Sequence, residues 1–119
     1  MIENFGIGID IADIDGFRNI LFEKKTSFYK KIFSKNEIDY CLKFKDPYTH
    51  FAGKFAIKEA VIKSLNYKIK LIDIQTDHHD EKPIVRITNK DDIIFKVSLS
   101  HEKNIAVAVV ISEIKSKTI

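Results

Sequence analysis

Four side chains of this 119-residue chain could do chemistry together: Asp10, Glu59, Lys63 and His101. Asp10 interrupts a run of glycine and isoleucine, and Glu59 and Lys63 stand four residues apart in an otherwise apolar segment. Carboxylates are hard oxygen ligands that suit Mg²⁺, which often takes one or two of them and completes its shell with water and substrate phosphates. A lysine beside them would neutralise phosphate charge. The set therefore predicts a magnesium and phosphate site.

Each of these residues also has an ordinary structural interpretation. Asp10 could be a turn or cap residue at the end of a strand. Glu59 and Lys63, four apart on a helix, could form a solvated ion pair that stabilises it by about 0.2–0.5 kcal/mol. His101 could be a simple turn residue. Spacing alone does not decide between these interpretations and a shared site.

The first of the elements that must position these residues is a strand at the N-terminus. Apolar and small residues alternate there, with Phe5, Ile7, Ile9 and Ile11 on one side and Gly6, Gly8 and Asp10 on the other. This alternation predicts a strand whose apolar face is buried. The two glycines leave the second face bare, so that another backbone or a ligand can approach closely.

A long central helix should carry Glu59 and Lys63. Asp46-Pro47 predicts its start, because Asp suits the N-cap and Pro the first turn. Asn66 is a reasonable stop. Its core-facing stripe consists of residues at near-helical spacing: Phe51, Phe55 and Ile62.

The remaining segments complete an α+β pattern. Ser34 and Glu37 form a capping-box motif that predicts a helix running to about Lys45. Shorter helices are expected over residues 15–23 and 27–33, and strands over residues 71–74, 84–87, 93–100 and 105–111. The last two strands would form a hairpin through a turn at residues 101–104. One strand, then helices, then strands favour an antiparallel sheet packed with a long central helix over a doubly wound parallel fold.

Composition narrows the class of protein. Hydrophobic residues make up 45% and charged residues 31% of the chain, which is typical of a globular domain, and we expect one domain over residues 1–119. The net charge of +3 is too small to predict a nucleic-acid partner, and no apolar run is long enough for a membrane span. Zinc is not favoured, because Cys41 has no second cysteine, although His78 and His79 could bind metal adventitiously. The lone cysteine fits a reducing compartment, the cytoplasm.

Three motifs, in this order and at this length, resemble the holo-[acyl-carrier-protein] synthases, the short bacterial 4′-phosphopantetheinyl transferases. They are GIGIDIADI near the N-terminus, FAGKFAIKEAVIKSL in the centre and VSLSHEKNIAVAVVI near the C-terminus. The family pattern has an Asp after a glycine-rich strand, a K-E-A helix with a Lys four residues after its Glu, and a Ser-His before a small apolar strand. The resemblance extends over roughly residues 2 to 112.

The resemblance implies a fold, an assembly and a reaction. The fold is a compact α+β unit that forms a homotrimer with active sites at the subunit interfaces. The reaction transfers 4′-phosphopantetheine from coenzyme A to a serine of apo acyl carrier protein, for fatty acid biosynthesis. The other product is adenosine 3′,5′-bisphosphate, and the cofactor is Mg²⁺.

The resemblance also assigns roles to individual residues. Asp10 and Glu59 would hold the metal, and Glu59 would also orient or deprotonate the serine. Lys63 would bind the diphosphate, so that these three residues form the catalytic set. Further coenzyme A contacts would come from three more basic residues: His101, Lys54 and Lys58.

Two departures from the family pattern affect carrier docking and the contacts made by the turn before Pro83. Asp15-Gly16 stands where the family often has a basic residue that binds the carrier, and the nearest basic residue is Arg18. The turn before Pro83 lacks the usual glycine. An acidic carrier could still be steered by other basic residues: Lys24, Lys25, Lys30, Lys31 and Lys35.

Two further functions stay open from the sequence alone. A non-catalytic module with the same fold would bind coenzyme A or the carrier without transfer, although the retained Asp10, Glu59, Lys63 and His101 argue against it. A basic nucleic-acid module would need concentrated charge that this chain lacks, and a steep salt dependence of binding would identify it.

Overall fold

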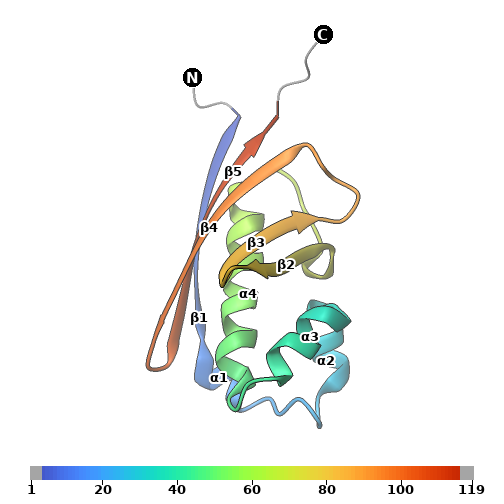
Figure 1. The fold of residues 1–119 in the computed structure, drawn as a ribbon, viewed down its shortest axis with the longest axis vertical. Coiled ribbons are helices and arrows are strands. Elements are labelled where there is room, and N and C mark those ends of the chain that lie inside the picture. The colour runs from blue at the N-terminus through green and yellow to red at the C-terminus, as the bar shows by residue number, and fades with distance from the viewer. Residues whose placement is uncertain (1–3, 116–119) are drawn as a thin grey trace.

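The computed structural model describes residues 4–115. A three-stranded antiparallel sheet of order β1-β5-β4 lies on one side of the long helix α4, and a two-stranded hairpin and two short helices lie on the other side (Figure 1). The elements in chain order are β1 (Phe5–Asp13), α1 (Ile14–Arg18), α2 (Thr26–Ile32), α3 (Lys35–Leu42), α4 (Pro47–Ser64), a 3-10 turn (Leu71–Asp73), β2 (Ile74–His79), β3 (Lys82–Ile87), β4 (Ile93–Glu102) and β5 (Ile105–Ile114). The α+β class with antiparallel sheets is confirmed.

Helix α4 begins as its sequence predicts. The Asp46 side chain accepts a hydrogen bond from the backbone N–H of Tyr48 at 3.1 Å, and Pro47 occupies the first turn. Phe51 is fully buried, together with three alanines that allow close packing against the sheet: Ala52, Ala56 and Ala60. The helix that carries Glu59 and Lys63 is therefore held firmly between two layers.

The capping box of α3 is also confirmed. Ser34 Oγ accepts from the Glu37 backbone N–H at 3.3 Å, and Glu37 Oε1 accepts from the Ser34 backbone N–H at 2.8 Å. Helices α1 and α3 end earlier than expected, at Arg18 and Leu42.

The faces of strand β1 are the reverse of the expected ones. The apolar side is open, with Ile7 70% and Ile11 66% exposed. The glycine side packs on α4, so closely that a Cβ at Gly6 or Gly8 would overlap a backbone carbonyl of that helix. The glycines thus make room for the helix backbone and not for a ligand.

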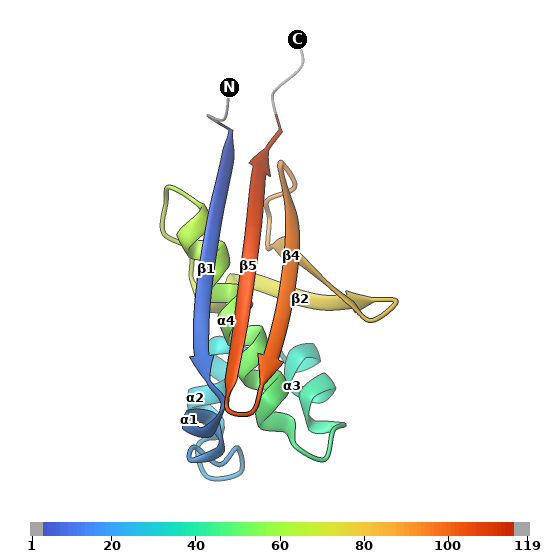
Figure 2. The same cartoon turned by 90° about the vertical axis from the view of Figure 1, so that its left-hand side faces the viewer.

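The open face of the sheet carries a continuous set of apolar side chains, which we call the outer apolar stripe. In Figure 2 this face of the sheet is turned toward the viewer and no helix lies in front of it. The register places Ile7 opposite Ile111 and Ile9 opposite Val109, so the stripe extends across two strands. Its exposed members are Phe5, Ile7, Ile9, Ile11, Ile105 and Ile111.

Both hairpins close through tighter turns than expected. His78 and His79 belong to β2, and the turn consists of Asp80 and Glu81, both with positive φ. His101 lies within β4, which continues to Glu102, and not in a turn. The turn between β4 and β5 consists only of Lys103 and Asn104. The predicted strand over residues 71–74 is also wrong, since its first three residues form the 3-10 turn.

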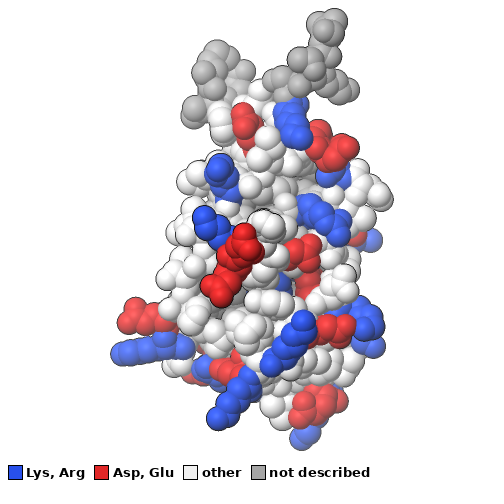
Figure 3. Space-filling view, in the orientation of Figure 1, with Lys and Arg blue, Asp and Glu red and all other residues white. Residues whose placement is uncertain are grey.

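None of the helices within residues 4–115 is long and apolar enough to cross a membrane. Figure 3 shows acidic and basic side chains interspersed over the face that it draws. That face presents no continuous basic stripe of the kind that follows a nucleic-acid backbone.

Candidate active site

Asp10 and Lys63 join strand β1 to helix α4. Asp10 lies on the helix-facing side of β1, with only 14% of its side chain exposed. Lys63 Nζ donates to Asp10 Oδ1 at 3.0 Å and to the Ile9 carbonyl at 3.1 Å. The two segments that the sequence predicts to belong together therefore meet in the fold.

Glu59 lies beside this pair, one helical turn before Lys63. Its carboxyl is half-buried, and its pKa is raised first by burial and then by the negative charge of Asp10, while Lys63 opposes the rise. Among the described ion pairs, Lys63 bonds to Asp10 and not to Glu59, so the interpretation of a simple pair along the helix surface is wrong. We call Asp10, Glu59 and Lys63 the carboxylate cluster.

The carboxylate cluster can attract a divalent cation but cannot enclose one. Two neighbouring carboxylates that disfavour each other's charge are stabilised by a cation between them. Within residues 4–115 no group of three or more His, Cys, Asp or Glu side chains is arranged to hold a metal. A cation here would need further oxygen ligands from water or substrate, and Mg²⁺ usually binds in this way.

Lys54 and His101 lie in a different place, a cavity of about 350 Å³ between α4, β2 and β4 that we call the phosphate pocket. Lys54 Nζ donates to the carbonyl and to the hydroxyl of Thr76, both at 3.0 Å, and sits 4.7 Å from the centre of the Tyr40 ring. A desolvated ammonium beside a histidine can bind an anion such as phosphate.

The phosphate pocket also contains residues that the sequence did not single out for it. Tyr40 stacks on His78 with ring centres 4.3 Å apart, and Phe44 stacks on His50 at 3.7 Å. Burial, followed by the positive charges nearby, lowers the pKa of both histidines. His50 could have been found from its place one helical turn before Lys54, whereas His78 reaches the pocket only through the pairing of β2 with β3.

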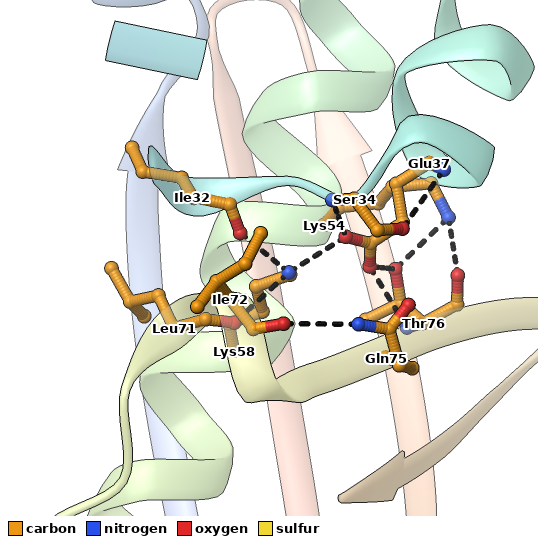
Figure 4. A network of polar contacts seen from close by, with 9 residues as sticks. All are labelled: Ile32, Ser34, Glu37, Lys54, Lys58, Leu71, Ile72, Gln75 and Thr76. Carbon is orange, nitrogen blue, oxygen red and sulfur yellow. Dashed lines mark hydrogen bonds and ion pairs between the residues drawn. The ribbon is translucent and has the colours of Figure 1, made fainter. Parts of the chain in front are cut away.

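Lys58 does not line the phosphate pocket, and its predicted coenzyme A contact is wrong for a physical reason. Its side chain is fully buried, and its three donors are all in use (Figure 4). Lys58 Nζ donates to Glu37 Oε1 at 2.7 Å and to the carbonyl oxygens of Ile32 at 2.7 Å and Leu71 at 3.0 Å. No donor is left for a phosphate.

Arg18 is occupied in the fold as well. Its guanidinium donates to Asp15 Oδ1 and to Asp46 Oδ2, each at 2.7 Å, and joins α1 to the start of α4. Two carboxylates compensate its charge, so little attraction is left for an acidic carrier. The five lysines of the alternative surface are all exposed: Lys24, Lys25, Lys30, Lys31 and Lys35.

One chain does not bring the carboxylate cluster and the phosphate pocket together. Asp10 belongs to β1 and His101 to β4, and β5 lies between these strands. Helix α4 crosses this face of the sheet, passing over Gly8 with Ala60 and meeting Leu99 with Gly53. The two groups therefore lie on opposite sides of the same helix.

Comparisons with known proteins identify the family of this chain. The family model of the 4′-phosphopantetheinyl transferase superfamily matches residues 6–110. The holo-[acyl-carrier-protein] synthase of Thermodesulfovibrio yellowstonii is 38% identical over 115 residues, covering 93% of this chain and 98% of the relative. That of Syntrophus aciditrophicus is 40% identical over 122 residues, covering 91% of this chain and 94% of the relative.

Two solved structures are similar over nearly the whole chain. A holo-(acyl-carrier-protein) synthase from Bacillus anthracis in complex with CoA (3′,5′-ADP) has a TM-score of 0.79 and 33% identity, and the match covers 93% of this chain and 96% of that one. The enzyme from Helicobacter pylori in complex with coenzyme A also has a TM-score of 0.79, with 30% identity and coverage of 90% and 99%.

Proposed function

Since the chain belongs to the 4′-phosphopantetheinyl transferase superfamily, we propose that it is a holo-[acyl-carrier-protein] synthase. It transfers 4′-phosphopantetheine from coenzyme A to a serine hydroxyl of apo acyl carrier protein. The products are the holo carrier and adenosine 3′,5′-bisphosphate, and the reaction serves fatty acid biosynthesis in the cytoplasm.

The carboxylate cluster is the observation that carries this proposal. The reaction must bring a neutral hydroxyl onto an anionic diphosphate, so it needs a base near the hydroxyl and positive charge near the phosphates. Glu59 offers a half-buried carboxylate and Lys63 a half-exposed ammonium on the same helix face. Asp10 holds Lys63 from the neighbouring strand.

The cluster fits Mg²⁺ as a cofactor. Asp10 and Glu59 would hold the ion, since adjacent carboxylates with hard oxygens bind Mg²⁺ in preference to softer metals. When bound, the ion supplies charge neutralisation at the diphosphate and stabilises the leaving phosphate.

The residues of the chain then have distinct tasks. Glu59 accepts the serine proton, directly or through a water molecule, and its raised pKa brings its basicity closer to that task. Two of the three donors of Lys63 are used in the fold, and the third donates to a diphosphate oxygen. Lys54 and His101 bind a coenzyme A phosphate in the phosphate pocket.

A homotrimer with interfacial active sites would bring the residues with these tasks together. The carboxylate cluster and the phosphate pocket lie on opposite sides of α4, so a neighbouring copy could place its pocket beside the cluster. The outer apolar stripe supports association, because a large exposed apolar patch rimmed by polar residues marks an interaction surface. In this assembly the carrier protein, which is acidic, would approach the exposed lysines of α2 and its flanks.

The decisive experiment mixes the purified protein with apo acyl carrier protein, coenzyme A and Mg²⁺. Mass spectrometry should show the carrier gaining the mass of one phosphopantetheine, and a chelator should prevent the gain. No gain with several carrier proteins would contradict the transferase. Binding of coenzyme A without transfer would identify the non-catalytic module instead.

A further inference from the structure

A buried network of polar side chains (Figure 4) reaches the phosphate pocket through Lys54 and Thr76, which line it. At its centre is the carboxylate of Glu37, which is 1% exposed and accepts four hydrogen bonds. Oε1 accepts from Lys58 Nζ at 2.7 Å and from the Ser34 backbone at 2.8 Å. Oε2 accepts from the backbone and the hydroxyl of Thr76, at 2.9 Å and 2.6 Å. Glu37 thus connects α3, α4 and β2.

The direction of the hydrogen bonds extends this network to Lys54. A hydroxyl has one proton to donate, and Thr76 gives it to Glu37. The lone pairs of Thr76 Oγ1 therefore face Lys54 Nζ, which donates to them at 3.0 Å. Hydrogen bonds in such a chain polarise one another, so the carboxylate strengthens the hold of the hydroxyl on the ammonium.

The charges of the network do not balance. It contains one carboxylate, Glu37, and two ammonium groups: Lys58 bonds the carboxylate directly, and Lys54 is linked to it only through the Thr76 hydroxyl. Lys58 already neutralises Glu37 and has no donor left. Lys54 uses two donors on Thr76 and keeps the third, at the wall of the phosphate pocket. Burial lowers the pKa of this lysine, so an anion in the pocket would stabilise its charged form.

We propose that Glu37 and Thr76 are positioning residues for coenzyme A. Through the Thr76 hydroxyl, the Glu37 carboxylate holds the Lys54 ammonium where it binds a phosphate group of coenzyme A. The inference rests on the proposed function, since it takes coenzyme A as the ligand. Glu37 does not line the phosphate pocket, and Thr76, which does, acts by holding Lys54. Lys58 alone forms the ion pair with Glu37, whereas Lys54 keeps one donor at the wall of the pocket, where a phosphate can accept it.

The test removes the hydroxyl and leaves the shape of the side chain. Thr76→Val should raise the KM for coenzyme A about tenfold and leave kcat within about twofold, because it weakens the hold on a charged group that acts in binding. Thr76→Ser restores the hydroxyl and should return KM to the wild-type value. The matched control is Thr26→Val, which removes a hydroxyl that donates to the Phe22 carbonyl at 2.9 Å, away from the pocket.

Two further measurements show that the effect passes through Lys54. In a Lys54→Gln background, Thr76→Val should add no further rise in KM, since coupled residues are not additive. Coenzyme A without its 3′-phosphate identifies the phosphate that is bound. The KM effect of Thr76→Val disappears with this substrate if Lys54 binds the ribose phosphate and persists if it binds the diphosphate, and either result supports the positioning role.

An unchanged KM in folded Thr76→Val would overturn the inference, as would an equal rise in Thr26→Val or a loss confined to kcat. If Thr76→Val does not fold, Thr76→Cys provides the same test, because a thiol is a weak hydrogen-bond donor. Failure of the proposed function is distinguishable, since it would appear as an inactive wild-type protein. In that case calorimetric titration with coenzyme A would still compare the variants.

Discussion

Lys63 Nζ lies 3.0 Å from Asp10 Oδ1, so the last turn of helix α4 is tied to strand β1 across 53 residues of sequence. The bond compensates the charge of Asp10, while burial, followed by the negative charge of Asp10, raises the pKa of the neighbouring Glu59. Under the proposed function, this charge pattern would suit a cation and a proton transfer.

The two carboxylates can be tested by isosteric substitution. Asp10→Asn and Glu59→Gln should each lower carrier modification by about 100-fold or more, because each removes a charge that stabilises the transition state. Circular dichroism should show folded protein in both. Asp91→Asn is the control, since Asp91 is exposed just before β4. Wild-type turnover in either test variant would remove that residue from the site.

The outer apolar stripe predicts the effect of a charge at its centre. Ile9 is 57% exposed in the single chain, and we expect it to be buried between copies. Ile9→Lys should shift the mass measured by light scattering from trimer to monomer, because an unpaired ammonium is costly to bury. Turnover should fall with it if the active sites are interfacial.

The control for this experiment is Ile84→Lys. Ile84 is 48% exposed on β3, in the small hairpin and not on the stripe. It should leave both mass and turnover unchanged. A wild-type protein that is monomeric and active would refute the interfacial site.

Local signals in the sequence predicted the local structure well. Asp46-Pro47 and the Ser34–Glu37 pair marked the starts of α4 and α3 because caps are formed within four residues of the chain. The last hairpin was also predicted, although its turn is two residues shorter. Lys103 has a positive φ in this turn, which a lysine does not predict.

Long-range burial could not be predicted in the same way. Alternation in β1 separates two faces but does not say which one meets α4, and the apolar face is the open one in the single chain. The resemblance assigned Lys54 and Lys58 to coenzyme A, but their burial could not be predicted, because their partners Thr76 and Glu37 lie 22 and 21 residues away. The meeting of Asp10 with Lys63 was predicted only by assuming that their two segments belong together.

The buried Lys58 predicts a large cost in stability. Lys58→Met should lower the free energy of unfolding by about 3–5 kcal/mol, because it leaves the Glu37 carboxylate without its ion-pair partner. Urea denaturation measures the change. Lys35→Met, which breaks an exposed pair, should stay within about 0.5 kcal/mol of the wild type. Equal effects of the two substitutions would contradict the buried ion pair.

The close contact between β1 and α4 predicts that an alanine costs more stability at Gly8 than at Gly16. A Cβ at Gly8 would overlap the Ala60 carbonyl, so Gly8→Ala should cost about 1–3 kcal/mol and move α4 away from Asp10. At Gly16 the nearest atom to a new Cβ is 3.5 Å away, so Gly16→Ala should be neutral or slightly stabilising. Thermal unfolding distinguishes them, and a neutral Gly8→Ala would contradict the close packing.

The last prediction concerns acid stability and the cap of α4. The hydrogen bond from Arg18 is the largest effect on the pKa of Asp46, and it lowers the pKa below the ordinary value of 3.8. Desolvation opposes it, and hydrogen bonds from Thr49 and the Tyr48 backbone add to the lowering. A lowered folded-state pKa means that the unfolded chain binds the proton more tightly. The stabilisation is therefore complete above the ordinary pKa and is lost as the pH falls through the lowered value.

Asp46→Asn should flatten this acid limb while it keeps a side chain that can cap the helix. Melting temperatures measured from about pH 6 to about pH 2 should fall less steeply in the variant than in the wild type. Arg18→Gln should flatten the limb in the same direction, because it removes the strongest donor to the carboxylate. Three parallel curves would show that the bond between Arg18 and Asp46 does not contribute to acid stability.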